Sequence, residues 1–399
     1  MKNLKKTWRN IQKNRFYKTT LLGGSLAIVV AAAWVVFALT PHADTSTTAS
    51  FQAENGTKSG NVSQVSDASA AGGNAVRFNA PGTGGGTCPV STPNEPGGPD
   101  PWGGCWPGAH NTGYPKGLPG DTRTPVGTLT NYTGPQEIQS CGVVIDKKIV
   151  PWLYIRAGNG TTSKDTPCVT IKNSWVKGTI FSDSPTAGPV VIQDTEVDSD
   201  GDLPYIENVG RYNYFMYRLN SHGGQGVLKC AANCEAKDNW IHGMTVGKEY
   251  HYNAIGGNGI ESGSFIIDHN WASCGDWESV QPGIGGDAGC SAVIGFYGDF
   301  APIRNITINR NFLKSTFDMS SGGVFRQAGY CLNPGYYVGK PNPNPTNMII
   351  TDNIFARGGS GKCGVFGPTN SLNKIGQGAT NIWTGNRYED GVTIPRVEE

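Results

Sequence analysis

The stretch VTIKNSWVKG, residues 169–178, sets the pattern from which the fold is predicted. Apolar Val169 and Ile171 alternate with polar residues, a polar pair follows, and Val176 then stands between two further outward positions. Alternation of this kind is typical of strands, because successive side chains point to opposite faces. The stretch therefore predicts two short strands joined by a tight bend.

The same pattern recurs along the rest of the chain. The recurring stretches are VVIQDTEVDS (190–199), YFMYRLNSHGG (214–224), CEAKDNWIHG (234–243), FIIDHNWASC (265–274), ITINRNFLKS (306–315), MIITDNIFAR (348–357) and NIWTGNRYED (381–390). A repeated two-strand unit with loops of varying length predicts a solenoid in which each unit is one coil. The 57 glycines, 25 prolines and 16% charged residues also fit an all-β chain rich in tight turns.

An asparagine column marks the bend of the repeat. The aligned residues are Ser174, Thr195, Leu219, Asn239, Asn270, Asn311, Asn353 and Asn386. An amide side chain can donate a hydrogen bond to one coil and accept one from the next. The column therefore predicts an asparagine ladder that fixes the register of successive coils.

With these repeats and this column, the chain from Cys141 to Glu399 resembles the right-handed parallel β-helix proteins of the pectin-lyase-like superfamily. The resemblance implies an all-β fold, a right-handed parallel β-helix. It does not choose an activity, because that scaffold hosts lyases, hydrolases, epimerases, adhesins and binding proteins.

Such proteins often carry an H-x-D-G-I phrase before a strand, and this chain departs from it. Gly259 and Ile260 are kept, but Asn258 stands where the aspartate would be, and an amide cannot act as a general base. His251 and Glu261 remain as the ionisable residues of an alternative site.

Two outward columns follow the bend. The first reads Trp175, Glu196, Asn220, Trp240, Trp271, Phe312, Ile354 and Arg387. The second reads Lys177, Asp198, His222, His242, Ser273, Lys314, Ala356 and Glu389. The apolar column between them is expected to face the core.

These columns predict one surface cluster of acid, base and aromatic side chains. The predicted catalytic residues are Glu196, Asp198, His222 and His242. The predicted substrate-binding residues, for stacking on sugar rings and bonding hydroxyls, are Trp240, Trp271 and Asn220. The alternative is a hydrogen-bonded stack that only satisfies the sheet.

No cofactor is predicted. The segment DSDGD, residues 198–202, alternates the oxygen ligands that calcium takes, but Val209 stands where an EF-hand needs a glutamate. A looser calcium site or a solvated turn is left open. His222, His242 and Asp198 are zinc-ligand types, although a hydrogen-bonded stack is the commoner arrangement.

The N-terminus predicts a single-pass membrane anchor. Residues 1–18 carry lysine and arginine without any acid, and residues 19–40 are then apolar or small. The run has about the 20 residues that a helix needs to cross a bilayer, and the basic flank is expected to stay in the cytoplasm. Secretion after cleavage is the alternative. Either way, the remainder is extracytoplasmic.

Four further segments follow the anchor. Residues 41–50 form a polar spacer, and 51–78 resemble the opening strands of carbohydrate-binding β-sandwich modules. Residues 79–140 are a Gly/Pro-rich linker or a cystine-held wrap, and 141–399 form the β-helix. Such modules need on the order of a hundred residues, so 51–78 is a strand-forming leader and not a complete domain.

Ten cysteines, an even number in an oxidising compartment, predict disulfides. Proximity in the coil alignment favours the pairs Cys88–Cys105, Cys141–Cys168, Cys230–Cys234, Cys274–Cys290 and Cys331–Cys363.

Together these features predict an extracytoplasmic, membrane-anchored carbohydrate-active protein, a polysaccharide lyase or a glycoside hydrolase that acts on the β-helix face. A noncatalytic polysaccharide-binding protein or adhesin is the alternative. The expected partner is a polysaccharide or cell-surface glycan, and the chain is expected to be a monomer. A formal net charge of +1 gives no field that would attract nucleic acid.

Overall fold

The computed structural model describes residues 62–66, 74–78, 88–199, 207–224, 226–244, 251–274, 289–315 and 328–399. All of them belong to one compact unit, Thr57–Glu399. The predicted tail, anchor and spacer, residues 1–50, lie outside the described residues. Within the described ranges, no helix is both long enough and apolar enough to cross a membrane.

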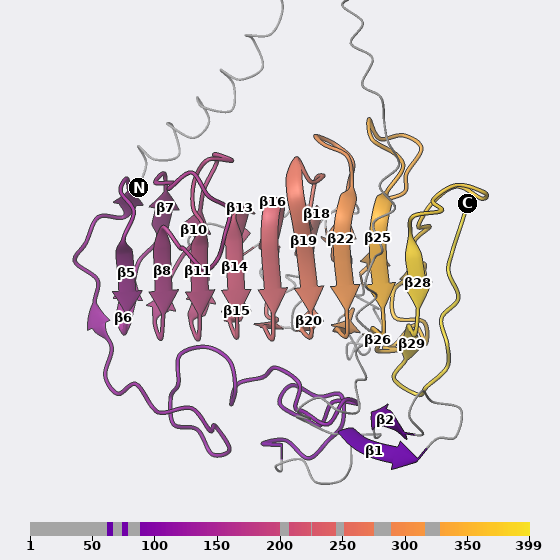
Figure 1. Cartoon of the computed structure of the whole chain (residues 1–399), viewed down its shortest axis with the longest axis horizontal. Coiled ribbons are helices and arrows are strands. Elements are labelled where there is room, and N and C mark those ends of the chain that lie inside the picture. Colours follow the sequence, from indigo (N-terminus) through magenta and orange to yellow (C-terminus); the bar gives the residue numbers. More distant parts are fainter. Residues whose placement is uncertain are drawn as a thin grey trace, which may run out of the picture. The chain divides into compact units, whose positions relative to one another are not determined.

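Three stacks of parallel strands build the main body (Figure 1). The β4 stack contains β4 (Glu137–Ile138), β7 (Leu153–Ile155), β10 (Ile180–Phe181), β13 (Glu207–Tyr212), β16 (Gly226–Lys237), β18 (His251–Gly257), β21 (Gly289–Phe296), β24 (Tyr330–Asn333) and β27 (Gly367–Thr369). The β5 stack contains β5 (Val143–Asp146), β8 (Val169–Lys172), β11 (Val190–Gln193), β14 (Tyr214–Tyr217), the end of β16, β19 (Ser262–Asp268), β22 (Arg304–Asn309), β25 (Thr346–Thr351) and β28 (Ile382–Thr384).

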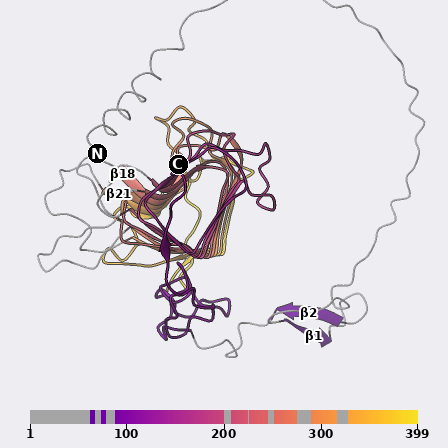
Figure 2. The ribbon, with the colours of Figure 1, turned by 90° about the vertical axis from the view of Figure 1, so that its left-hand side faces the viewer.

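The β3 stack is a separate sheet that carries the predicted site columns. It contains β3 (Thr130–Asn131), β6 (Lys148–Val150), β9 (Trp175–Val176), β12 (Glu196–Asp198), β15 (Asn220–His222), β17 (Trp240–Ile241), β20 (Trp271–Ser273), β23 (Phe312–Lys314), β26 (Ile354–Phe355) and β29 (Arg387–Tyr388). The chain passes from one stack to the next and then returns one coil further on, so that successive coils superpose in the end-on view (Figure 2). This arrangement is a parallel β-helix, and the predicted all-β solenoid is confirmed.

The solenoid begins earlier than its repeat pattern suggests. Its first parallel strands are β3 and β4, which precede Cys141. Each of them has two residues, and two residues are too few to show an alternating pattern.

The predicted register of the β3 stack is correct. Glu196 pairs with Asn220, Asn220 with Trp240, and Trp240 with Trp271. The inward column between the two outward ones fills the core, as Val197 and Leu313 illustrate with no exposed surface. Alternation of inward and outward residues along each strand therefore places the site columns on the outer face.

The asparagine ladder is present. The Nδ2 atoms of Asn239, Asn270, Asn311 and Asn353 donate to Oδ1 of the next asparagine at 2.8–2.9 Å. Each Oδ1 also accepts a backbone N–H, as in the 2.9 Å bond from Asn270 N to Asn311 Oδ1. All of these amides are buried, so the ladder satisfies backbone groups that would otherwise lose water without a partner.

The residue before each ladder position takes left-handed backbone angles. The φ values are 49° for Asn173, 48° for Asp194, 52° for Arg218, 58° for Asp238 and 53° for His269. Asn and Asp adopt this conformation at low cost, which explains the polar pair at each bend. The result is a column of polar and charged side chains along one corner of the solenoid.

All five predicted disulfides form. They are Cys88–Cys105, Cys141–Cys168, Cys230–Cys234, Cys274–Cys290 and Cys331–Cys363. The described residues contain no free cysteine.

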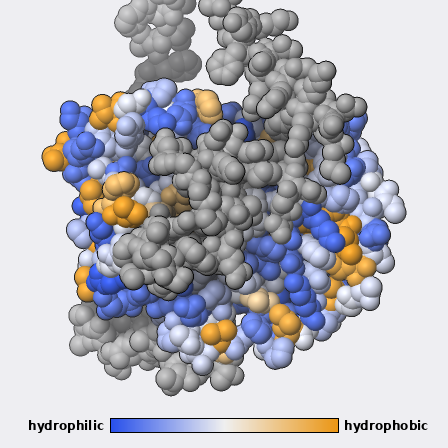
Figure 3. Space-filling view, turned by 180° about the vertical axis from the view of Figure 1, so that it is seen from behind, coloured by the Kyte–Doolittle hydropathy of each residue, from blue (hydrophilic) through white to orange (hydrophobic). Residues whose placement is uncertain are grey.

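Two features precede the solenoid in the chain. The leader contains an antiparallel pair, β1 (Val62–Ser66) and β2 (Asn74–Phe78). Residues Cys88–Val126 form an irregular segment, here called the strap, which contacts the corner and outer face of the β3 stack (Figure 2). On the side opposite to the view of Figure 1, hydrophobic residues are scattered among hydrophilic ones over the coloured surface (Figure 3).

Candidate functional site

The register of β12 and β15 brings two carboxylates to one imidazole. Asp198 pairs with His222 across the strands, and Glu196 precedes Asp198 on the same face. The His222 Nε2 atom lies 3.3 Å from Glu196 Oε1, and its Nδ1 atom lies 3.5 Å from Asp198 Oδ1. Both ring nitrogens therefore face carboxylate oxygens, and the predicted grouping of these three side chains is observed.

His242 completes the cluster from the next coil. Its ring lies 5.2 Å from the His222 ring and stacks on Trp240 at 3.6 Å, with Nε2 placed 2.9 Å from Asn220 Oδ1. Burial lowers the pKa of His242 to about 3, and the neighbouring His222 adds to this effect. His242 is therefore neutral near pH 7 and donates its Nε2 hydrogen to Asn220.

The Glu196 carboxylate is held in its ionised form. Burial would raise its pKa, but hydrogen bonds and charge from His222 and Lys116 outweigh burial and lower the pKa. The Lys116 Nζ atom lies 2.5 Å from Glu196 Oε2. Lys116 belongs to the strap, which the sequence had indicated only as a linker or wrap.

Strap residues also cover the outer face further along the same stack. Trp271 is only 5% exposed, and its Nε1 donates to Asn94 O at 2.9 Å. It forms a second hydrophobic cluster with Trp106 of the strap and with Phe312 and Ile354, and Trp240 packs against that cluster. The predicted sugar platform at Trp271 therefore faces the strap and has no open surface for a sugar ring.

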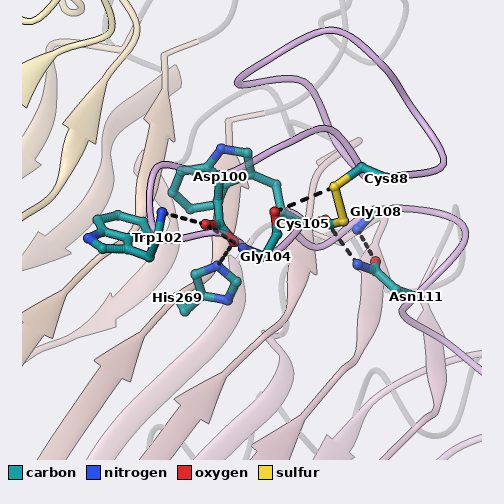
Figure 4. The surroundings of a disulfide bond; sticks show 9 residues. Cys88, Asp100, Trp102, Gly104, Cys105, Gly108, Asn111 and His269 are labelled. Carbon is teal, nitrogen blue, oxygen red and sulfur yellow. Dashed lines mark hydrogen bonds and ion pairs between the residues drawn. A yellow bond between two sulfur atoms is a disulfide. The ribbon is translucent and has the colours of Figure 1, made fainter. Parts of the chain in front are cut away.

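A histidine at the corner fastens the strap (Figure 4). His269 lies between two carboxylates, with Nδ1 2.7 Å from Asp238 and Nε2 3.2 Å from Asp100 of the strap. Trp106 stacks on its ring with centroids 5.2 Å apart. Burial would lower the pKa of His269, but its bonds to Asp100 and Asp238 raise the pKa to about 9.

Asp100 is itself fixed by its own loop. Its Oδ1 accepts hydrogen bonds from the backbone N–H groups of Trp102 at 2.7 Å and Gly104 at 3.0 Å, inside the loop that the Cys88–Cys105 disulfide closes (Figure 4). The strap therefore presents a preorganised carboxylate to His269. No short motif signals this contact, because the two residues are 169 positions apart.

An open strip remains at the other end of the two columns. Trp175 pairs with Glu196 and is half-buried, and the exposed Lys177 places its Nζ 4.1 Å from the Trp175 ring centre. Asp198 and His222 keep about a fifth of their side-chain surface exposed. Trp175, Lys177, Asp198 and His222 are called the open strip below. The columns had already contained Trp175 and Lys177, but without a predicted role.

The alternative site, His251 and Glu261, is described only in part. Glu261 is exposed at the corner between β18 and β19, and its Oε1 accepts a hydrogen bond from Tyr212 at 2.8 Å. The His251 backbone lies in β18, but its side chain lies outside the described part of the structure.

Metal binding was considered at two places in the sequence. Asp200 and Asp202 of the calcium-like segment lie outside the described residues. Across the described ranges, no group of three or more His, Cys, Asp or Glu side chains is arranged to hold a metal ion, and this includes Asp198, His222 and His242.

Comparisons with protein-family models, with curated proteins and with solved structures gave no match to this chain.

Proposed function

We propose that this chain is an extracytoplasmic, membrane-anchored carbohydrate-active protein of the right-handed, pectin-lyase-like type. The observation that carries the proposal is the open strip. It combines an aromatic ring, a cation and a carboxylate–imidazole pair on the outer face of a solenoid. Aromatic faces pack on pyranose rings, while charged neighbours orient a polymer. The fully paired described cysteines fit an oxidising compartment.

Lyase chemistry is favoured over hydrolysis at this strip. A lyase needs a base at the C5 proton and a cation beside the uronate carboxylate, and His222 with Asp198 and the exposed Lys177 are groups of these kinds. A hydrolase needs one protonated carboxylic acid. Glu196 does not suit that role, because the hydrogen bond to His222, which does not involve the strap, and the ion pair with Lys116 outweigh burial and lower its pKa.

A noncatalytic glycan-binding protein is the second candidate. Two observations favour it: Lys116 forms an ion pair with Glu196, and Trp271 is buried under the strap. These contacts leave the Trp175 ring and the Lys177 cation as binding groups without requiring proton transfer.

Turnover measurements on the full chain test the proposal. The chain is incubated with a panel of uronic and neutral polysaccharides, and both unsaturated products and new reducing ends are followed. Asp198→Asn should lower turnover by on the order of 10²- to 10⁴-fold. Lys314→Ala, in the same column but beside strap residue Glu95, is the matched control and should retain activity. Binding without turnover in the unmodified chain would select the noncatalytic candidate, and neither binding nor turnover would reject both.

A further inference from the structure

The strap consists of two halves that are held in different ways. The first half, Cys88–Thr112, contains the disulfide loop and Trp106, which has no exposed surface. It is anchored by the cluster with Trp271 and by the bond from Asp100 to His269. Moving it would expose several large aromatic side chains to water, which is costly.

The second half, Gly113–Val126, is here called the lid. It contributes no side chain to either hydrophobic cluster. Its hydrogen bonds and ion pairs with the solenoid run from Gly113 N to Arg218 O at 2.9 Å, from Lys116 to Glu196 at 2.5 Å and from Arg123 to Asp194 at 2.9 Å. Two further bonds join it to the first half, from Arg123 to Thr112 O at 3.1 Å and from His110 Nδ1 to Pro119 O at 2.8 Å. Such contacts can exchange with water at a much smaller cost than apolar burial.

A cavity of about 740 Å³ lies beside the lid. Its lining includes Cys105 of the anchored half, Pro115 and Val126 of the lid, and Arg218 of the solenoid corner. The lid therefore borders free space at this cavity, although Gly120 lies against Pro89 of the first half.

Two glycines bracket the lid. Gly113 has a φ of 67° and Gly127 a φ of 73°, which is left-handed backbone that glycine adopts at no steric cost. A side-chain carbon at Gly127 would meet no atom within 4 Å, whereas one at Gly113 would lie 3.0 Å from Asn220 Cβ. The first residue of the lid, Gly113, therefore lies against Asn220, whereas the backbone at Gly127, directly after the lid, has no close neighbour.

We propose that Gly113–Val126 is an autoinhibitory lid, which swings away from Glu196 and Asn220 to admit a glycan while Cys88–Thr112 stays on the solenoid. In the closed state Lys116 occupies the carboxylate of Glu196 and Gly113 covers Asn220. A ligand that needs these groups binds the open state alone, so its apparent affinity falls with the closed population. The ligand part rests on the proposed function, but the motion does not.

Hydrogen exchange of the full chain, read peptide by peptide, tests the motion without any ligand. Amides of the lid are expected to exchange at least about 10-fold faster than those of Cys88–Thr112. Arg123→Gln removes the bond to Asp194 together with those to the Thr112 and Gly113 carbonyl groups. It should accelerate exchange in the lid by about 5-fold, while exchange in Cys88–Asn111 of the anchored half is unchanged. The matched control is Arg156→Gln, which breaks an ion pair with Glu137 elsewhere on the solenoid and should leave the lid rate unchanged. Equal rates in both halves, or a joint response to Arg123→Gln, would refute the lid.

A binding measurement separates this inference from the proposed function. For a polysaccharide that binds the unmodified chain, Arg123→Gln should lower Kd by about 5-fold and leave kcat unchanged. Unchanged Kd with accelerated lid exchange would refute autoinhibition. In a third outcome, no polysaccharide binds the unmodified chain or the Arg123→Gln variant, but amides of the lid still exchange faster than those of Cys88–Thr112. This result would support the motion of the lid and reject the proposed function.

Discussion

The two ends of the same outward columns have opposite environments. At β9 to β15, the columns present Trp175, Lys177 and His222 to solvent in part. At β20 to β26, they present Trp271 and Phe312, which the strap buries. The strands, register and outward direction are the same at both ends. The difference comes from a segment outside the repeat, so an outward aromatic residue on a solenoid predicts a binding face only when nothing else in the chain covers it.

The ladder changes along the same axis. From Asn239 onward, towards the covered end, asparagines occupy the ladder positions, whereas the open end has Ser174, Thr195 and Leu219 there. Ser174 and Thr195 donate to backbone carbonyls two residues earlier and do not bond each other in the manner of the asparagines. The open end therefore lacks the continuous amide chain that ties together the coils under the strap.

The largest expected stability effect is the loss of the strap anchor. Trp106→Ala should lower the free energy of unfolding by about 4 kcal/mol, because it removes a fully buried aromatic side chain and leaves a cavity against Phe312. Denaturant unfolding provides the measurement, and tryptophan emission should shift to the red as Trp271 meets water. Tyr114→Ala, on the lid, is the control and should cost about 1 kcal/mol or less. A comparable loss in both variants would remove the distinction between anchor and lid.

A ladder pair sharpens the same contrast. Asn311→Ala should cost about 3 kcal/mol, because it leaves the backbone N–H of Asn270 without its acceptor in the core and removes one of the acceptors of Asn270 Nδ2. Thr195→Val should cost about 1 kcal/mol, because only the 2.8 Å bond to Gln193 O is lost. Equal values from chemical denaturation would mean that the ladder adds nothing specific to the covered end.

Two histidines predict opposite pH dependences. The pKa of His269 is raised from 6.5 to about 9, so its stabilising effect is complete below pH 6.5 and is lost as the pH rises through 9. The pKa of His242 is lowered from 6.5 to about 3, so stability is lost as the pH falls below 6.5 towards 3. At about 1.4 kcal/mol per pKa unit, each effect amounts to roughly 3 kcal/mol between about pH 4 and about pH 10.

Unfolding free energies measured from pH 4 to 10, within the range of these titrations, check both histidines. His269→Gln should flatten the alkaline decline and His242→Gln the acid decline. An alkaline decline of the same slope in His269→Gln would show that the imidazolium does not fasten the strap through Asp100 and Asp238.

The smallest expected effect concerns the edge of the strap. Lys314 and Glu95 are 3.9 Å apart and both partly exposed, so Lys314→Ala should change the unfolding free energy by less than about 0.5 kcal/mol. A loss above 1 kcal/mol by the same assay would mean that peripheral ion pairs, and not the Trp106 cluster, hold the strap.

Local repetition explains why much of the solenoid was predictable. Apolar alternation and the asparagine column gave the register that joins Glu196 to Asn220 and Asp198 to His222, and hence the grouping of the candidate site. Disulfides such as Cys141–Cys168 followed, because each pair closes a short segment near aligned coils.

The strap could not be placed in this way. Its contacts with the solenoid, such as Asp100 with His269 and Asn94 with Trp271, join residues far apart in sequence and follow no repeat. A glycine- and proline-rich composition carries no periodicity to indicate which face it covers. The burial of Trp271 and the ion pair between Glu196 and Lys116 could therefore be learned only from the structure.

One matched pair of substitutions tests most directly whether the open strip is the functional surface and the covered end a structural one. Glycan affinity and unfolding free energy are measured for Trp175→Ala and Trp271→Ala, two members of one column. Trp175→Ala should weaken binding by at least about 10-fold at a stability cost of about 1 kcal/mol, because the lost ring stacks on the ligand. Trp271→Ala should cost about 3 kcal/mol in stability, while the folded fraction binds with affinity unchanged within about 2-fold. Lost binding in Trp271→Ala together with retained binding in Trp175→Ala would contradict the account.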